Sequence, residues 1–216
     1  MTSPVQAWES LDFTLKYAGP LVSSQSAHHR NAKASLRHEF NLQLAVLWRV
    51  HPYLKKLDPG LFERQPSRKF RMAEVAPSVL YESDLRYRCL LGGIDYVPIV
   101  TYGHRAHCHL AIRLHSRREP GGIIHSGADM DNRLKVLLDA LTIPNAGQES
   151  PTGQSDGTED LVYCLLEDDE LVTKLSIETF RLLKDEPTDH NYVEVDIDIH
   201  VVPISPAPYN YPLLVP

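Results

Sequence analysis

Cysteine is scarce in this sequence. Only three cysteines, Cys89, Cys108 and Cys164, occur among its 216 residues, and each lies in an apolar, strand-like run. An odd and scattered set does not form a disulfide framework, and the spacings match no zinc site. We therefore expect three buried thiols in a reducing compartment.

Long apolar segments are also missing. No run of about 18 apolar residues occurs, and the first ten residues lack the basic and apolar regions of a signal peptide. The composition, 43% hydrophobic and 23% charged, is typical of a soluble globular protein. The length suits one domain with a substantial core. The sequence thus predicts a single cytoplasmic domain over residues 1–216, with no membrane partner.

A net positive charge is absent as well, since the formal net charge is -6. The charges are unevenly distributed, however. Residues 28–118 hold 16 Lys and Arg against 7 Asp and Glu, whereas residues 119–216 hold 5 against 19. A basic half can meet phosphate groups, and an acidic half can hold a metal ion. The alternative is an uneven distribution without functional meaning.

Hydrophobic periodicity predicts the fold class. The expected order is strand 11–17 ending at Gly19-Pro20, helix 35–50 stopped by Pro52, an irregular basic segment, strand 105–115, a helix within 127–141, and strands 171–183 and 192–203. This order predicts an α+β fold, with a mixed or antiparallel sheet and packed helices. The acids of the last strand are expected on the solvated face of an edge strand.

Four segments lie outside this regular pattern. Residues 23–33 are polar and are expected to form a basic loop before the first helix. The others are a basic insertion around 53–80, a flexible loop at 144–160 that is rich in Gly, Ser and Pro, and an uncharged, Pro-rich tail at 203–216.

The helix within 127–141 has a strong apolar pattern. Its leucines follow helical spacing and predict one buried stripe, with a methionine one turn earlier: Met130, Leu134, Leu137, Leu138 and Leu141. Val136 and Ala140 lie roughly opposite this stripe. A second apolar strip calls for a second packing partner, and we expect a dimer mate.

Two aspartates begin the same helix. If Asp129 and Asp131 were both helical, their side chains would diverge by roughly 200° and could not share a ligand. If Asp129 is the N-cap, outside helical geometry, the carboxylates can turn toward one another. A plain, well-capped helix would use the same residues. Lys135, one turn after Asp131, forms either a surface salt bridge or a fixed charge beside a phosphate.

A second acidic cluster, Glu167-Asp168-Asp169-Glu170, follows the apolar run 161–166. Four adjacent carboxylates repel each other, so they are expected either in a solvated turn or around a divalent cation shared with Asp129 and Asp131. If the segment continues the preceding strand, neighbouring side chains point to opposite faces, and only one of Asp168 and Asp169 can reach that cation.

These motifs together resemble the RusA-type Holliday-junction resolvases. The resemblance rests on Asp129-Met-Asp131-Asn132-Arg-Leu-Lys135, the Leu-rich helix that follows, and the later Asp168-Asp169 pair. Two positions depart from the family pattern. Gly127-Ala128 stands where a basic residue and proline are frequent, and Arg133 stands at a position that is usually apolar.

The resemblance implies a RusA-like fold and a dimeric endonuclease that depends on Mg²⁺ or Mn²⁺ and cuts four-way DNA junctions during recombination and repair. Asp129, Asp131 and Asp169 match the metal-binding acids, and Lys135 matches the catalytic lysine. Asn132 and Asp168 are expected to lie next to these residues without binding the metal, and to orient them. Basic residues expected to contact DNA are Arg68, Lys69, Arg71, Arg113 and Arg133.

Two other functions remain open from the sequence. One is a DNA-binding module with the same fold and no catalysis. The other is a metal-dependent phosphohydrolase that acts on small nucleotides. Cleavage of a synthetic junction, binding without cleavage, or release of phosphate from nucleotides would separate the three.

Overall fold

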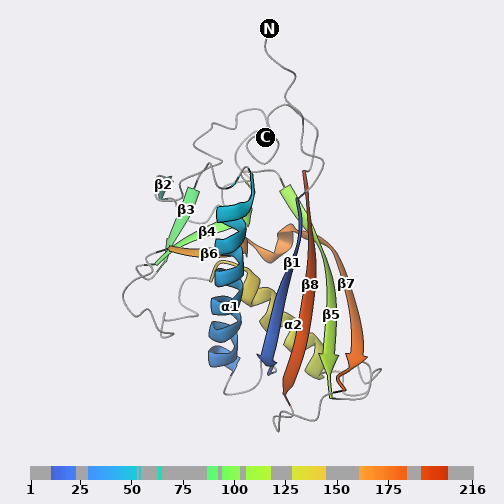
Figure 1. Cartoon of the computed structure of the whole chain (residues 1–216). Helices are drawn as coiled ribbons and strands as arrows, with labels where there is room; N and C mark the ends of the chain where they lie inside the picture. Colours follow the sequence, from blue (N-terminus) through green and yellow to red (C-terminus); the bar gives the residue numbers. More distant parts are fainter. Residues whose placement is uncertain are drawn as a thin grey trace.

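The described part of the chain forms two four-stranded sheets and two α-helices (Figure 1). The computed structural model describes residues 11–22, 29–52, 54, 63–64, 87–91, 94–102, 106–117, 128–144, 161–183 and 191–203. Its elements are β1 (Leu11–Pro20), α1 (His29–Val50), β2 (Glu63–Arg64), β3 (Tyr87–Leu91), β4 (Ile94–Val100), β5 (Ala106–Ser116), α2 (Ala128–Leu141), β6 (Leu161–Leu166), the 3-10 helix η4 (Asp169–Leu171), β7 (Val172–Arg181) and β8 (Tyr192–Pro203). The predicted α+β class, with a mixed sheet and packed helices, is confirmed.

The larger sheet has the strand order β1-β8-β5-β7. β8 runs antiparallel to β1 and to β5, whereas β7 runs parallel to β5. β8 was expected to be an edge strand, and this prediction is wrong, because β8 lies between β1 and β5. Its acids remain on the outer face, where Asp196 and Asp198 form ion pairs with cations of the neighbouring strands. The edges of the sheet are β1 and β7.

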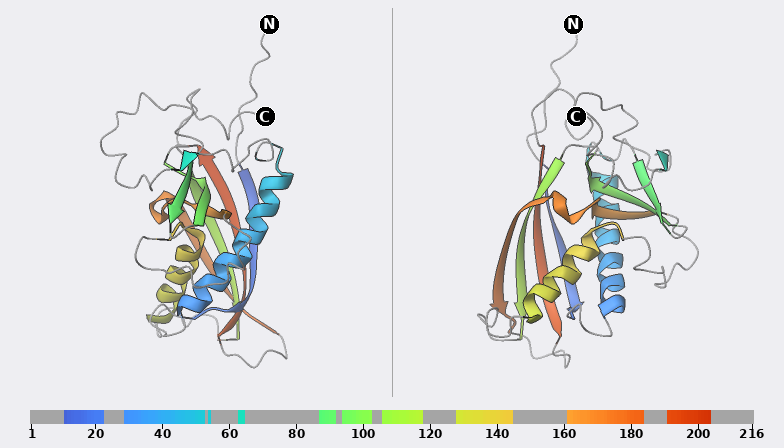
Figure 2. Two further views of the ribbon diagram at one scale, coloured as in Figure 1. Left: turned by 90° about the vertical axis from the view of Figure 1, so that its left-hand side faces the viewer. Right: turned by 180° about the vertical axis from the view of Figure 1, so that it is seen from behind.

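α2 lies on the inner face of this sheet, opposite to the face that carries the ion pairs of β8, and α1 lies at the β1 edge. α2 crosses behind the sheet, and α1 lies along β1 between the two sheets (Figure 2). Buried Asn41 on α1 accepts a hydrogen bond from the backbone N–H of Tyr163 on β6, at 2.8 Å. The Trp48 ring lies 5.6 Å from the Tyr163 ring. α1 therefore joins both sheets into one core.

α1 is longer than predicted. It begins at His29, so residues 29–33, which were expected in a loop, are helical. The spacing of Leu36, Phe40, Leu44 and Leu47 predicts its apolar side; the first three are buried, whereas Leu47 is only partly buried. The helix ends at Val50, two residues before Pro52.

The smaller sheet was not predicted as a sheet. Its order is β2-β3-β4-β6, with β3 antiparallel to β4 and β4 parallel to β6. The sequence signal was present, because Gly92-Gly93 separates two apolar runs by two residues, a typical hairpin connection. The run 161–166 is the strand β6.

The cysteines are free and buried, as predicted. Burial raises the pKa of the Cys108 thiol to about 12, and it also raises the pKa of Cys164. Within the described ranges, no helix is both long and apolar enough to cross a membrane.

Most of the irregular segments predicted from the sequence lie outside the described residues. These are the insertion around 53–80 apart from Leu54 and β2, the loop 144–160 apart from Pro144, and the tail after Pro203. Arg68, Lys69 and Arg71 belong to this undescribed part, so their expected role in DNA binding stays a prediction.

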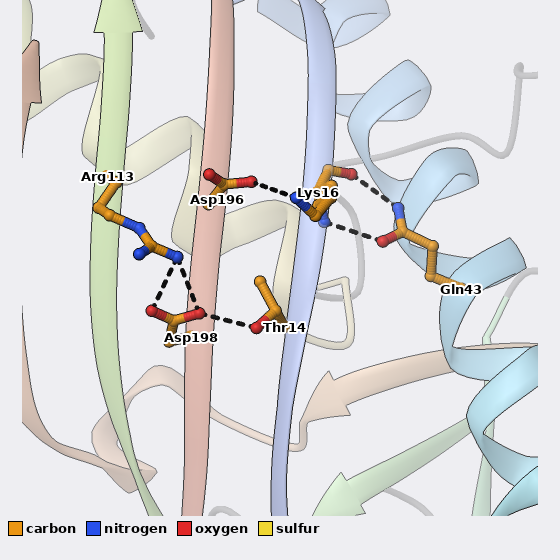
Figure 3. A network of polar contacts seen from close by, with 6 residues as sticks. All are labelled: Thr14, Lys16, Gln43, Arg113, Asp196 and Asp198. Carbon is orange, nitrogen blue, oxygen red and sulfur yellow. Dashed lines mark hydrogen bonds and ion pairs between the residues drawn. The ribbon is translucent and has the colours of Figure 1, made fainter.

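The β1 edge is covered by α1. The Gln43 side chain on α1 accepts a hydrogen bond from the Lys16 N–H, at 2.8 Å, and donates one to the Lys16 carbonyl oxygen, at 2.7 Å (Figure 3). An amide side chain thus takes the place of a neighbouring strand at this position. Near the end of β1, a Cβ atom at Gly19 would approach the Tyr17 hydroxyl oxygen to 2.6 Å, which favours glycine there.

Candidate functional site

The first turns of α2 carry the first half of the candidate site. α2 begins at Ala128, so Asp129 lies inside the helix, and the N-cap placement that would let it turn toward Asp131 is wrong. Positions 129 and 131 are separated by roughly 200° around a regular helix. Asp131 and Lys135 are both exposed, one turn apart, on the side of α2 away from the core. Asn132 beside them is half-buried.

The buried face of α2 is rotated from the one predicted. Leu137 and Leu141 are buried as expected, but Leu134, Leu138 and Met130 are only partly buried. The rest of the buried face consists of Arg133, Val136 and Ala140. Val136 and Ala140 therefore belong to the core of the same chain, in which α2 packs against α1. Their predicted role as a strip facing a dimer mate is wrong.

Arg133 does not face DNA, contrary to expectation. Its side chain is buried, with 3% exposure, and donates a hydrogen bond to Asn191 Oδ1 at 3.3 Å. Helical spacing could have revealed this, because Arg133 stands three and four residues before Val136 and Leu137, on the same side of α2. Arg113, the other described candidate, lies on the outer face of the sheet, where it is paired with Asp198 at 3.0 Å.

The second half of the candidate site is the acidic run after β6, and it divides into two kinds of residue. Glu167 and Asp168 are buried, with 3% and 5% exposure. Glu167 accepts a hydrogen bond from the Tyr102 N–H at 3.0 Å, and Asp168 caps η4 by accepting one from the Glu170 N–H, also at 3.0 Å. These two carboxylates therefore hold the backbone, which explains much of the acidic run without a metal ion.

Asp169 and Glu170 are the exposed acids of the run. The premise that this segment continues the preceding strand is wrong, because η4 separates β6 from β7. Asp168 and Asp169 nonetheless differ strongly in exposure, since Asp168 is buried and Asp169 is exposed. The Tyr102 hydroxyl donates to Glu170 at 3.1 Å, and burial together with the charge of Asp168 raises the pKa of Tyr102.

The two halves lie at opposite ends of α2 (Figure 2). The end of α2 is fixed beside β6, because Thr142 bridges to Leu166 and the Ile143 N–H donates to the Leu166 carbonyl oxygen at 3.0 Å. Leu166 is three residues from Asp169. Asp131 lies 11 residues before Thr142, a helical rise of about 16 Å. One chain therefore does not bring Asp131 and Asp169 together.

The same separation is visible along the sheet. Arg133 in the second turn of α2 contacts Asn191, which precedes β8, so this end of α2 lies where β8 begins and β5 ends. η4 precedes β7, and β7 begins beside Cys108 near the start of β5. Among the described side chains, no three His, Cys, Asp or Glu residues lie close enough to hold a metal ion. The acids have suitable chemistry for a hard cation, but the length of α2 keeps Asp131 and Asp169 apart within one chain.

No protein-family model, curated protein or solved structure matches this chain. The likeness to RusA-type resolvases is therefore carried by the motif residues and their spacing.

Proposed function

We propose that this protein is a RusA-like, metal-dependent endonuclease that cuts four-way DNA junctions as a homodimer. The observation that carries the proposal is the start of α2. Asp131 and Lys135 stay exposed in adjacent turns of a helix whose other side is buried in the core. Asp131 and Lys135 of the Asp-x-Asp-Asn-x-x-Lys motif are thus presented on the surface, where a phosphate can reach them.

The separation of the acids makes a second copy necessary to this proposal. Asp129 and Asp131 lie at one end of α2, and Asp169 lies near the other. In a two-fold dimer, the start of α2 in one copy can approach η4 of the other, so that two identical sites form across the interface. Two sites related by symmetry also suit paired cuts in a four-way junction.

In such a dimer, Asp131 of one copy and Asp169 of its partner would hold Mg²⁺ or Mn²⁺, because carboxylate oxygens are the ligands these ions prefer. Asp129 lies roughly 200° from Asp131 around the helix and would not share that ion. The ion would polarise the scissile phosphate and activate a water molecule. Lys135 lies one turn from Asp131, and its charge would stabilise the negative charge that develops on the phosphate oxygens. The reaction is hydrolysis, in which water oxygen bonds to phosphorus and the phosphorus bond to the leaving oxygen breaks.

Subunit mixing tests this proposal. Asp131→Asn and Asp169→Asn are each expected to be inactive on a synthetic four-way junction with Mg²⁺. In a mixed dimer, the Asp169→Asn copy supplies an intact Asp131, and the Asp131→Asn copy supplies an intact Asp169. One of the two sites is then complete. With random mixing, about one quarter of the sites are restored, and the product should carry single nicks.

The controls separate the other outcomes. Asp131→Asn mixed with the double variant Asp131→Asn/Asp169→Asn has no complete site and should stay inactive. Activity that is lost in both variants but never restored by mixing would place all the acids in one chain and contradict the shared site. Full activity in either variant alone would remove that residue from the site.

A DNA-binding module without catalysis is the second candidate. It is favoured by the hydrogen bonds of Glu167 and Asp168, which give half of the acidic run a structural role. Junction binding by the wild-type dimer without cleavage under either Mg²⁺ or Mn²⁺ would select it over the nuclease.

A further inference from the structure

We propose that β7 is the dimer interface, and that it pairs antiparallel with β7 of a second copy about a two-fold axis at Ser176. The two four-stranded sheets would then form one continuous sheet. The interface is argued from β7 alone and does not rest on the proposed function.

β7 is the open edge of the larger sheet. It is ten residues long, and in the described part of the chain its only ladder partner is β5. Most of its side chains are exposed on both faces of the sheet, including Leu175 and Phe180 at 39% each. After a register shift between Val172 and Lys174, the ladder with β5 is regular from Lys174 to Arg181. A regular edge with exposed apolar side chains is a template for another strand.

The charges of β7 indicate which strand fits. Lys174 and Glu178 are exposed on the outer face, in register with His109 and Arg113 of β5. Four residues along a strand span about 13 Å, so Lys174 and Glu178 cannot pair with each other within one chain. Arg113, the neighbour of Glu178, turns toward Asp198 on β8 instead (Figure 3).

A two-fold axis at Ser176 satisfies both charges. In antiparallel pairing about that axis, each Lys174 faces Glu178 of the second copy, and each Leu175 faces Ile177 on the inner face. Opposite charges and apolar pairs facing one another across strands are stabilising, so the sequence of β7 is complementary to itself in this register.

The neighbouring registers lack this complementarity. Residues directly opposite each other in an antiparallel pair point to the same face of the sheet. A two-fold axis perpendicular to the sheet also keeps each side chain on its own face. Only registers whose axis passes through a residue meet both conditions. Moving the axis to Ile177 places Lys174 against Phe180 and Ser176 against Glu178. Moving it to Leu175 places Lys174 against Ser176. Only the axis at Ser176 pairs Lys174 with an acid.

This pairing would have a consequence for the proposed function. In the antiparallel pair, the first residues of β7 in one copy lie beside the last residues of β7 in the other. η4 precedes β7, and the start of α2 lies toward the opposite end of the sheet. Asp169 of one copy would therefore come to the level of Asp131 in the other. This meeting of the acids, unlike the interface, rests on the proposed function.

Charge reversal tests the interface without any activity assay. Lys174→Glu leaves only acids facing each other, and Glu178→Lys leaves only lysines. Each is expected to weaken dimerisation about tenfold or more in sedimentation equilibrium, because like charges then meet across the axis. The double variant Lys174→Glu/Glu178→Lys should dimerise like the wild type. An equal mixture of the two single variants should form a heterodimer, because both contacts then join Glu to Lys.

The matched control is Arg49→Glu, which reverses an exposed charge near the end of α1 and should leave the dimer unchanged. A wild-type protein that is monomeric at high micromolar concentration would overturn the proposal. A dimer that tolerates both single reversals would also overturn it.

A single cysteine fixes the register. Ser176→Cys places two thiols beside each other on the axis, whereas Glu178→Cys places them about 13 Å apart. The native cysteines are buried, so the background is low. Mild oxidation should cross-link Ser176→Cys into a covalent dimer and leave Glu178→Cys monomeric on a denaturing gel. Cross-linking of Glu178→Cys in preference to Ser176→Cys would overturn this register. The cross-linking test needs no DNA. A protein that cross-links at Ser176→Cys but does not cut junctions would therefore support the interface and contradict only the proposed nuclease activity.

Discussion

The two edges of the larger sheet have different surroundings. At β1, the side chain of Gln43 on α1 bonds to both the N–H and the carbonyl oxygen of Lys16, and alternate side chains of the strand are buried. At β7, the described residues supply a neighbour on one side only, and most of the side chains are exposed. Within the described ranges, the chain therefore closes one edge by itself and leaves the other available to a second strand.

This difference bears on the candidate site. Asp131 and Asp169, which the sequence predicts in one cluster, lie near the two opposite ends of α2. β7 runs between those ends at the edge of the sheet. A second copy added at β7 is the simplest way to join them. The covered β1 edge, in contrast, is remote from Asp169, because β8 and β5 lie between β1 and β7.

The same truncation at the two edges should give the largest difference. Leu15 on β1 has 2% exposure and belongs to the core, whereas Leu175 on β7 has 39%. Leu15→Ala should lower the free energy of unfolding by about 2–5 kcal/mol, since it leaves a cavity. Leu175→Ala should cost less than about 1 kcal/mol in the dilute monomer. Urea denaturation at low protein concentration measures both, and equal losses would contradict the comparison.

Opening the closed edge should have an intermediate effect. Gln43→Ala removes both hydrogen bonds to Lys16 and should cost about 1–2 kcal/mol in thermal or urea unfolding. Gln43→Glu keeps an acceptor for the Lys16 N–H but sets a carboxylate oxygen against the Lys16 carbonyl oxygen, so it should not restore the stability of the wild type. A Gln43→Ala protein as stable as the wild type would show that this amide does not close the edge.

The dependence of stability on pH should be the smallest effect. It involves His109, which lies beside Lys174 of β7 on the outer face of the sheet. Burial lowers the pKa of His109, helped by the charges of His107, His200 and Lys174. The folded state therefore binds this proton less readily than the unfolded state. Its contribution to stability is complete above about pH 6.5 and decreases as the pH falls toward the lowered pKa. His51 behaves in the same way, because burial lowers its pKa too.

Removing one of these charges gives a direct check. Lys174→Gln should raise the pKa of His109 in an NMR titration of the imidazole and flatten the acid limb of the stability curve. The neighbouring acid Asp12 is already paired with His200 and should retain that contact. A pKa of His109 that falls or stays unchanged would show that Lys174 does not act on this face.

Local sequence patterns predicted most of the larger sheet and both helices. The alternation in β1, β5 and β8 and the spacing of Leu36, Phe40 and Leu44 report burial directly, because a buried face repeats with the period of its element. The order of the strands could not be read this way. β8 has polar residues on one face because that face carries cross-strand ion pairs, and the same pattern would be found in an edge strand.

The candidate site was predicted only as separate motifs. The exposure of Asp131 and Lys135 follows from the helical pattern, yet the position of Asp169 depends on where β6 and η4 pack against the end of α2. That packing is a tertiary property with no local signal. Arg133 shows the opposite failure, since its charge suggested a surface position while its helical spacing indicated burial.

Amide hydrogen exchange along both edges, measured at two protein concentrations, tests the central claim most directly. The Lys16 amide should be protected at low and high concentration alike, because Gln43 of the same chain holds it. The amides of β7 that point away from β5 should exchange freely in the dilute monomer and become protected as the dimer forms. Protection of those β7 amides that does not change with concentration, or their free exchange in a protein that is demonstrably dimeric, would contradict the claim that β7 is the edge left for a second copy.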